Sequence, residues 1–337
     1  MKEKKKILLI TTGGTIASDI TDEGLAPKLS ADEMISYLPD MEDCELTTLP
    51  VCNIDSTNVT RNEWRLMSET IEEHYQQYDG FVIAHGTDTM AYTACALSYM
   101  IRNPDKPIIL TGAQKPIHFE STDAKRNLAD SITYACRGNM PGVVIVFDGD
   151  VIAGTRGKKM KTKSYHAFSS INYSNLAKIQ DDKIIRYMNF RETNDPIAFY
   201  HELSDKVFLL KLTPGMSGDI IEYLLEKYQC LVLESFGVGG LPDNLLEMLK
   251  RVLQKYNPNE KIIIIATQVI EEDSDVKTYA VGGGLSGSID YLERLDMTLE
   301  AVFTKMMWIL GIDELTWPEQ KELFYKSINH DIVEDIF

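Results

Sequence analysis

Short β-favouring runs alternate with helix-length amphipathic segments along most of the 337 residues, and this alternation constrains the fold more than any other feature. Strands separated by helices indicate βαβ units, which build parallel sheets. In the first half we expect strands at Lys6–Ile10, Glu45–Leu49, Phe81–Ala84, Ile108–Thr111 and Val143–Phe147. Apolar residues at helical spacing predict two buried helix faces, formed by Trp64, Met67, Ile71 and Tyr75 and by Ala124, Leu128, Ile132 and Ala135.

The pattern becomes irregular and polar between Tyr187 and Ser204 and then resumes, which predicts two domains. We expect an N-terminal domain over residues 1–186, a linker over 187–205 and a smaller C-terminal domain over 206–337. In the C-terminal domain, strands are expected at Val207–Leu212, Leu231–Leu233 and Ile262–Ala266. Helices are expected at Asp219–Tyr228, Asp243–Lys255 and around Leu299, Val302, Met306 and Ile309.

Charge and composition exclude several classes of protein. Thirty-four basic and 51 acidic residues give a net charge of -17, which repels nucleic acids and anionic membranes, so neither is expected as a partner. No apolar run approaches the roughly 18 residues that span a bilayer, and the short run Ile7–Ile10 after the basic start is neither signal peptide nor anchor. Five cysteines without a C-x-x-C pair favour a reducing cytoplasm over a disulfide framework or a structural zinc site.

Hydroxyl-bearing and charged residues follow several of the expected strands. These segments are Thr11–Ser18, His85–Met90, Thr111–Pro116 and Gly154–Lys159. The carboxyl ends of parallel strands meet at one edge of a sheet, where ligands bind. Each segment also has a purely structural interpretation, since Thr15 or Asp88 can cap a helix and the lysines can lie in a solvated loop. Their convergence on one edge favours a binding or catalytic site.

Four segments resemble signatures of the bacterial L-asparaginases of the cytoplasmic type. They are the Gly-Gly-Thr-Ile turn at Gly13–Ile16, the run Asn53–Thr57, the His-Gly-Thr-Asp-Thr-Met turn at His85–Met90 and the strand end Thr111–Pro116. Their order and spacing are also similar, and the likeness continues to the final helix. The resemblance implies a larger flavodoxin-like domain, a smaller C-terminal α/β domain and the hydrolysis of L-asparagine to L-aspartate and ammonia. Neither a metal nor another cofactor is expected.

The resemblance also implies a role for each matching residue. Catalysis falls to Thr15, Thr87, Asp88 and Lys159, and substrate binding falls to Ser56, Thr57, Asp88 and Ala113. Thr15 would attack the amide carbon to form an acyl-enzyme, because a threonine hydroxyl is the available nucleophile once a neighbouring group accepts its proton. Counting from Arg156 and from Phe168 selects Lys159, with Lys158 as the alternative if the loop shifts by one residue.

One departure from the family concerns the segment after the nucleophile, which commonly carries a tyrosine that closes over the substrate. Ser18–Pro27 contains no tyrosine, and the first one is Tyr37 in an expected helix. Thr21, a tyrosine from elsewhere in the protein or Lys159 could take part in the first proton transfer instead. His85 is left unassigned, because a histidine at a strand end more often has a structural role.

Three other functions remain open. A glutaminase-asparaginase differs only in accepting one more methylene, which is worth about 1 to 3 kcal/mol in a pocket. An amino-acid sensor would account for the absent tyrosine, and a component of a tRNA-dependent amidotransferase is disfavoured by the net charge. The family resemblance further implies a homodimer or homotetramer.

Overall fold

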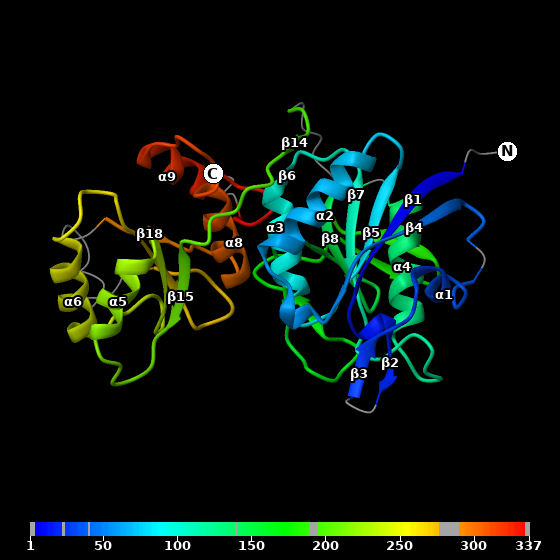
Figure 1. The fold of residues 1–337 in the computed structure, drawn as a ribbon, viewed down its shortest axis with the longest axis horizontal. Coiled ribbons are helices and arrows are strands. Elements are labelled where there is room, and N and C mark those ends of the chain that lie inside the picture. The colour runs from blue at the N-terminus through cyan, green and yellow to red at the C-terminus, as the bar shows by residue number, and fades with distance from the viewer. Residues whose placement is uncertain are drawn as a thin grey trace. The chain divides into compact units, whose positions relative to one another are not determined.

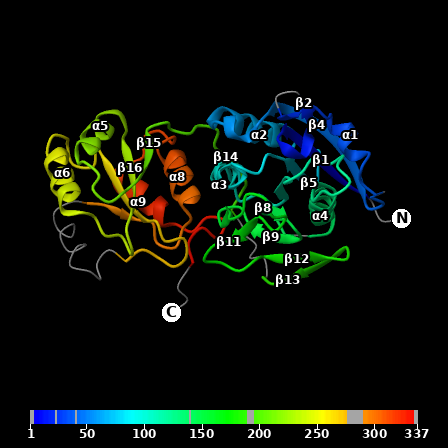
Figure 2. The same ribbon diagram turned by 90° about the horizontal axis from the view of Figure 1, so that it is seen from below.

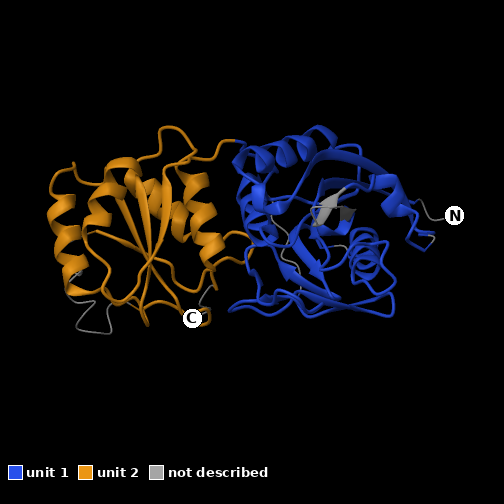
Figure 3. Cartoon of the chain, turned by 60° about the horizontal axis from the view of Figure 1, so that its bottom comes forward, with its two compact units in different colours: residues 1–201 blue, residues 202–337 orange. Residues whose placement is uncertain are grey.

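The computed structural model describes residues 4–21, 24–39, 41–138, 140–188, 195–275 and 290–333. The chain divides into two compact units, Met1–His201 and Glu202–Phe337, which are coloured separately in Figure 3. The division falls within the segment 187–205 that was expected to be a linker. All seven site residues named by the resemblance lie in unit 1.

Unit 1 is built on an eight-stranded sheet with the order β13-β12-β9-β8-β7-β5-β1-β4. Its parallel strands are β1 (Lys5–Gly13), β4 (Cys44–Ile54), β5 (Gly80–Ala84), β7 (Pro107–Thr111) and β8 (Gly142–Phe147). In chain order these five strands have the arrangement 2-1-3-4-5, which is the flavodoxin-like order. Three antiparallel strands extend the sheet beyond β8, namely β9 (Asp150–Ala153), β12 (Ala177–Gln180) and β13 (Lys183–Arg186).

Helices cover both faces of this sheet, as Figures 1 and 2 show. The helices are α1 (Ala31–Ile35), α2 (Arg61–His74), α3 (Met90–Met100) and α4 (Ala124–Arg137). The run Ile7–Ile10 of β1 is completely buried, as expected for a strand enclosed on both sides. Leu128 and Ile132 of α4 bury in the same core as Ile7 and Leu9, because alternate residues of a strand share one face.

Short elements decorate the carboxyl edge and periphery of unit 1. They are the 3-10 helices η1 (Thr15–Ala17) and η2 (Ser56–Asn58) and the strand pairs β2 (Ser18–Thr21) with β3 (Gly24–Pro27), β10 (Gly157–Lys159) with β11 (Phe168–Ser170), and β6 (Ile101–Arg102) with β14 (Ala198–Phe199). The segments η1, η2 and β10 carry four of the expected site residues.

Unit 2 contains a four-stranded parallel sheet with the order β15-β16-β17-β18. The strands are β15 (Val207–Lys211), β16 (Cys230–Ser235), β17 (Ile262–Thr267) and β18 (Leu292–Glu293), and the helices are α5 (Asp219–Lys227), α6 (Asp243–Leu253), α8 (Leu299–Ile309) and α9 (Trp317–Tyr325). Buried leucines of α5 and α6 pack with those of β16. The predicted fold class, a larger domain with a mainly parallel sheet and a smaller α/β domain, is confirmed.

One pair of cysteines forms a disulfide, although the number and spacing of the cysteines argued against a disulfide framework. Cys44, at the start of β4, is bonded to Cys136 near the end of α4, and the two Cα atoms are 6.4 Å apart. These residues are 92 positions apart in the sequence, so only the packing of α4 on the sheet brings them together.

Within the described ranges, the helices include none with the length and apolar character that crossing a membrane requires.

A fully buried ion pair ties α8 to the C-terminal segment of unit 2. Lys305 and Asp331 both have 0% of their side chains exposed, and Lys305 Nζ lies 2.7 Å from Asp331 Oδ2. Nζ also donates to the Lys326 carbonyl at 2.8 Å, and the Asp331 carboxylate accepts the N–H of Ile328 at 2.7 Å. Removing one member therefore takes away the ion pair of a charge whose side chain has no exposed surface.

We expect Asp331→Asn to lower the free energy of unfolding of unit 2 by about 3 to 5 kcal/mol, because the neutral amide removes the carboxylate charge that faces the buried Lys305 ammonium. Chemical denaturation followed by circular dichroism measures the loss. The control is Asp290→Asn. The Asp290 carboxylate lies 3.4 Å from Lys321 Nζ and both side chains are exposed, so this variant should lose less than about 1 kcal/mol. Similar losses in the two variants would contradict the interpretation.

Candidate active site

The expected site residues gather at the carboxyl edge of the unit 1 sheet. Thr15 lies two residues after the end of β1, and Thr87 and Asp88 follow β5, the neighbour of β1. In the 2-1-3-4-5 order, strands β1 and β5 flank the point where the winding direction of the sheet reverses, and α/β proteins bind ligands in the crevice at this point.

Glycines bring the turns of this edge into direct contact. Gly14 has φ +75°, and a Cβ there would lie 2.5 Å from the Cα of Gly86. A Cβ on Gly86 would lie 2.6 Å from Ser56 Oγ. Only glycine fits at these positions, because the backbones touch and Gly14 adopts the left-handed region. The turn before Thr15 therefore packs on the turn before Thr87, and the latter turn lies beside Ser56.

Lys159 forms the centre of a polar cluster with two residues after β5. Its Nζ donates to Thr87 Oγ1 at 2.7 Å and lies 2.6 Å from Asp88 Oδ1. The Lys159 side chain is 17% exposed, whereas that of Asp88 is 57% exposed. The lysine is therefore largely buried, and the carboxylate with which it pairs is accessible to solvent. β10 pairs Lys159 with Phe168, and Lys158 points to the opposite side of the strand. The structure thus brings Lys159 into the cluster.

The segment that contains Ser56 and Thr57 is held by its own turn and by the β5 turn. The Asp55 carboxylate caps η2 by accepting the N–H of Thr57 at 2.8 Å and its hydroxyl at 2.7 Å. Thr89 Oγ1 donates to the Ser56 carbonyl at 2.7 Å. Ser56 is buried and Thr57 is exposed, which leaves Thr57 at the open side of the site.

His85 supports the β5 turn from below. The Gly86 carbonyl can only accept, so His85 Nδ1 carries the ring hydrogen and donates to it at 2.7 Å. In the neutral ring Nε2 is then an acceptor, and the Thr93 hydroxyl donates to it at 3.0 Å while accepting the Trp64 indole N–H at 2.9 Å. Burial lowers the pKa of His85 to about 4, so the ring is neutral at neutral pH. With both nitrogens engaged, His85 orients the turn and is not the base for Thr15.

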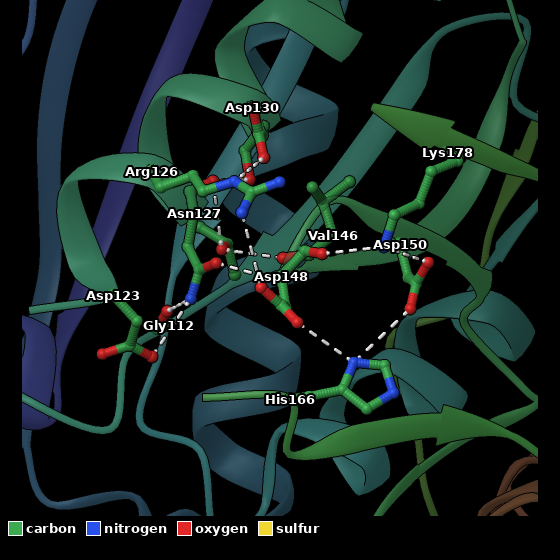
Figure 4. Close-up of polar contacts among 12 residues, drawn as sticks. Gly112, Asp123, Arg126, Asn127, Asp130, Val146, Asp148, Asp150, His166 and Lys178 are labelled. Carbon is green, nitrogen blue, oxygen red and sulfur yellow. Dashed lines mark hydrogen bonds and ion pairs between the residues drawn. The ribbon is translucent and has the colours of Figure 1, made fainter. Parts of the chain in front are cut away.

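Ala113 lies in a strand end that α4 holds from the other side. Asp123 occupies the N-cap position of α4, but its side chain makes no capping bond. The carboxylate instead accepts the backbone N–H groups of Gln114 and Lys115 at 2.9 to 3.1 Å. Asn127, one turn later, donates to the Gly112 carbonyl at 2.9 Å, as Figure 4 shows. Sequence reasoning missed this pair. Its signal was two polar residues four apart beside an apolar helix stripe.

The segment that lacks the tyrosine common in the family forms two short strands. Within Ser18–Pro27, the strands β2 and β3 pair in antiparallel fashion, and the side chain of Thr21 lies outside the described residues. Tyr37 follows the end of α1 instead of lying within that helix, and the Nζ of Lys125 stands 5.5 Å from its ring centre. Among the described residues, the Thr15 side chain has no hydrogen-bond partner. The acceptor of the Thr15 proton is therefore not built into these described contacts.

The buried carboxyl group of Asp130 in α4 is expected to make the stability of the protein depend on pH. Burial raises the pKa of its carboxyl from 3.8 to about 6, although Arg126 Nε lies 3.5 Å away. A raised pKa means that the stabilising contribution is fully present below about pH 4 and is lost as pH rises through about 6. The ionised carboxylate therefore destabilises the protein at neutral pH.

We expect Asp130→Asn to raise the melting temperature at about pH 8, with a gain in free energy of up to about 3 kcal/mol, and to give no gain near pH 4. Thermal melts of wild type and variant at both pH values measure the effect. A gain of equal size at both values would show that ionisation of Asp130 is not its cause.

Models of two protein families match this chain. The model described as Asparaginase, N-terminal, covers residues 6–191, and the Glutaminase/Asparaginase C-terminal domain covers residues 206–324. The L-asparaginase of Thermococcus kodakarensis is 36% identical over 312 residues, which are 91% of this chain and 93% of that relative. The solved structure of the thermostable L-asparaginase from the same organism has a TM-score of 0.90 at 35% identity and covers 98% of this chain and 100% of its own.

Two further relatives differ in kind. L-asparaginase 1 of Escherichia coli K12 is 30% identical over 323 residues, covering 92% of this chain and 93% of the relative. A component of the glutamyl-tRNA(Gln) amidotransferase of Methanosphaera stadtmanae is 33% identical over 327 residues, covering 92% of this chain and 73% of the relative.

The fold, the site at its switch point and these similarities define a two-domain α/β amidohydrolase that acts on a linear amide. More specifically, the chain belongs to the asparaginase family, with one family domain in each unit. The resemblance inferred from the four motifs is therefore confirmed.

Proposed function

We propose that the protein hydrolyses L-asparagine to L-aspartate and ammonia through an acyl-enzyme on Thr15. The observation that carries this proposal is the cluster of Lys159, Thr87 and Asp88, packed beside the Thr15 turn at the switch point. A threonine hydroxyl needs a neighbouring proton relay, and the contact between Gly14 and Gly86 brings the turn that carries Thr87 and Asp88 against the turn that carries Thr15.

The first half-reaction forms an ester and releases ammonia. The Thr15 oxygen attacks the side-chain amide carbon of the substrate as its proton passes into the relay, and the amide nitrogen leaves as ammonia after the relay delivers a proton to it. Backbone N–H groups near Gly14 or Thr87 stabilise the oxyanion, and each such donor contributes about 3 to 4 kcal/mol to the transition state. The Lys159 ammonium polarises the Thr87 hydroxyl, which relays protons between the reacting atoms and the Lys159–Asp88 pair.

The second half-reaction adds water to the ester. The same relay takes a proton from the attacking water and returns one to the Thr15 oxygen as the ester bond breaks and L-aspartate leaves. Ser56, Thr57 and Asp88 hold the α-carboxylate and α-ammonium groups. The exposed Asp88 carboxylate has an oxygen to spare for an ammonium group beside the one that pairs with Lys159. The Ala113 carbonyl accepts a hydrogen bond from the amide nitrogen. No step requires a metal or an organic cofactor.

Ammonia release from L-asparagine and from L-glutamine by the purified protein tests the reaction and its substrate. We expect turnover of L-asparagine, and comparing the two values of kcat/KM separates an asparaginase from a glutaminase-asparaginase. Tight binding of L-asparagine or L-aspartate without ammonia release at any concentration would overturn the hydrolase proposal in favour of an amino-acid sensor.

A second candidate is suggested by the 33% identity to the amidotransferase component, although this chain spans only 73% of that relative. Such a component would supply ammonia to a partner that carries tRNA. The net charge of -17 opposes direct contact with a phosphate backbone. Filter binding with tRNA distinguishes the candidates, because retention of tRNA at moderate salt would favour the amidotransferase role.

We also propose, on the family resemblance, that the enzyme acts in the cytoplasm as a homodimer or homotetramer. Analytical ultracentrifugation and cell fractionation test these two points. A monomer, or a protein found outside the cytoplasmic fraction, would contradict them.

A further inference from the structure

We infer that Asp123, with support from Asn127, is a positioning residue that sets the direction of the Ala113 carbonyl. The inference rests on the proposed function, in which this carbonyl accepts a hydrogen bond from the amide nitrogen of the substrate. Figure 4 shows Asp123 just before α4 and Asn127 in its first turn, with Asn127 bonded to Gly112.

The first argument is the geometry of one peptide unit. The Ala113 carbonyl and the Gln114 N–H belong to the same planar group and point in opposite directions in a trans peptide. The Gln114 nitrogen lies 2.9 Å from Asp123 Oδ2 and 3.1 Å from Oδ1. A carboxylate that holds this N–H toward α4 therefore turns the Ala113 carbonyl away from α4.

The second argument is that the peptide units on either side are fixed as well. Lys115 N–H donates to Asp123 Oδ1 at 3.1 Å, and the Gly112 carbonyl accepts from Asn127 Nδ2 at 2.9 Å. Asn127 Nδ2 also lies 3.3 Å from Asp123 Oδ2, which holds the carboxylate in place. Three consecutive peptide units around Ala113 are thus locked to a single helix.

The third argument is the use that α4 makes of Asp123. An aspartate at an N-cap ordinarily accepts N–H groups of its own helix. Asp123 is buried, and its side chain makes no capping bond, while Thr122 Oγ1 accepts the N–H of Ala124 at 3.0 Å. The Asp123 carboxylate therefore binds the backbone of the strand end and not the N–H groups of its own helix.

The Asn127 side chain also connects this strand end to the next one. Its Oδ1 accepts the N–H of Asp148 at 2.9 Å, and the Asp148 carboxylate lies 3.1 Å from His166 Nδ1. His166 lies in the segment between β10 and β11, so the helix that orients Ala113 is linked to the hairpin that carries Lys159.

The test compares an amide with an ester in the full-length protein. L-Aspartate β-methyl ester has no N–H on its leaving group, so a correctly directed Ala113 carbonyl assists only the amide. We expect Asp123→Ala to lower kcat/KM for L-asparagine about 10- to 100-fold, mainly through kcat, and that for the ester less than about threefold. Asp123→Asn, which keeps one acceptor oxygen, should show a smaller loss on the amide.

Asp79→Ala is the matched control. The Asp79 carboxylate also accepts a backbone N–H of a strand, that of Lys6 at 2.8 Å, but at the opposite edge of the same sheet. We expect this variant to lose thermal stability and to keep the wild-type ratio of amide to ester hydrolysis. Equal losses on both substrates in Asp123→Ala, or a changed ratio in Asp79→Ala, would overturn the inference.

Failure of the proposed function has a different signature, since wild type would then hydrolyse neither substrate. In that case, hydrogen exchange of the peptide around Gln114 and Lys115 tests whether the Asp123 carboxylate clamps these two backbone N–H groups. Protection in wild type and in Asp79→Ala, with loss of protection in Asp123→Ala, would uphold the clamp, and fast exchange in wild type would overturn it.

Discussion

Thr15→Ala should reduce ammonia release from L-asparagine by about 10³-fold or more while leaving substrate binding largely intact, because removing a nucleophile removes the covalent pathway itself. Thr15 lies after β1 at the switch point, and its side chain makes no hydrogen bond among the described residues, so the substitution removes no hydrogen bond there. Steady-state ammonia release and calorimetric titration with L-asparagine measure the two quantities separately.

Thr12→Val provides the control for this prediction. Thr12 lies on the same strand, and its hydroxyl donates to the Ala84 carbonyl at 3.1 Å. Its replacement should cost stability but leave kcat close to that of wild type. Turnover by Thr15→Ala at a rate near that of Thr12→Val would mean that Thr15 is not the nucleophile.

Lys159→Met should lower kcat by about 10²- to 10⁴-fold, the range expected for loss of a general acid or base. Methionine keeps much of the length of the chain but cannot donate to Thr87 or pair with Asp88. Because the relay serves both half-reactions, hydrolysis of the β-methyl ester should fall as well. This separates the Lys159 effect from that of Asp123, which is expected to act on the amide alone.

The adjacent Lys158→Met is the control, since the alternation of β10 directs Lys158 to the other side of the strand. Steady-state kinetics on both substrates should show nearly wild-type rates. A greater loss in Lys158→Met than in Lys159→Met would transfer the proposed role to Lys158.

The strands and helices with strong periodicity could be predicted because their burial depends on local pattern. Ile7–Ile10 has the pattern of a strand enclosed on both faces, and α4 shows its apolar stripe directly. The antiparallel strands β9, β12 and β13 were missed because they are four residues each and carry little pattern. The disulfide between Cys44 and Cys136 was missed because helix packing, and not spacing, brings the two residues together.

The candidate site divides in the same way. Thr15, Thr87 and Asp88 are adjacent to strand ends in the sequence, so topology alone predicts that they meet. The contact of Lys159 with Thr87 and Asp88 depends on the β10–β11 pairing, which no local pattern reveals. The support of the β5 turn by His85, and that of Ala113 by Asp123, each require a side chain to reach another element. Which backbone groups these side chains bind follows only from the three-dimensional packing of the elements.

The most direct test of the acyl-enzyme is partitioning in the presence of hydroxylamine. Wild type would be given L-asparagine or L-aspartate β-methyl ester at the same hydroxylamine concentration, and the ratio of aspartate hydroxamate to aspartate would be measured. If both substrates form the same ester on Thr15, the ratio is the same from either one, and Thr15→Ala forms neither product at a comparable rate. Ratios that differ between the two substrates would contradict a common acyl-enzyme and the mechanism built on Thr15.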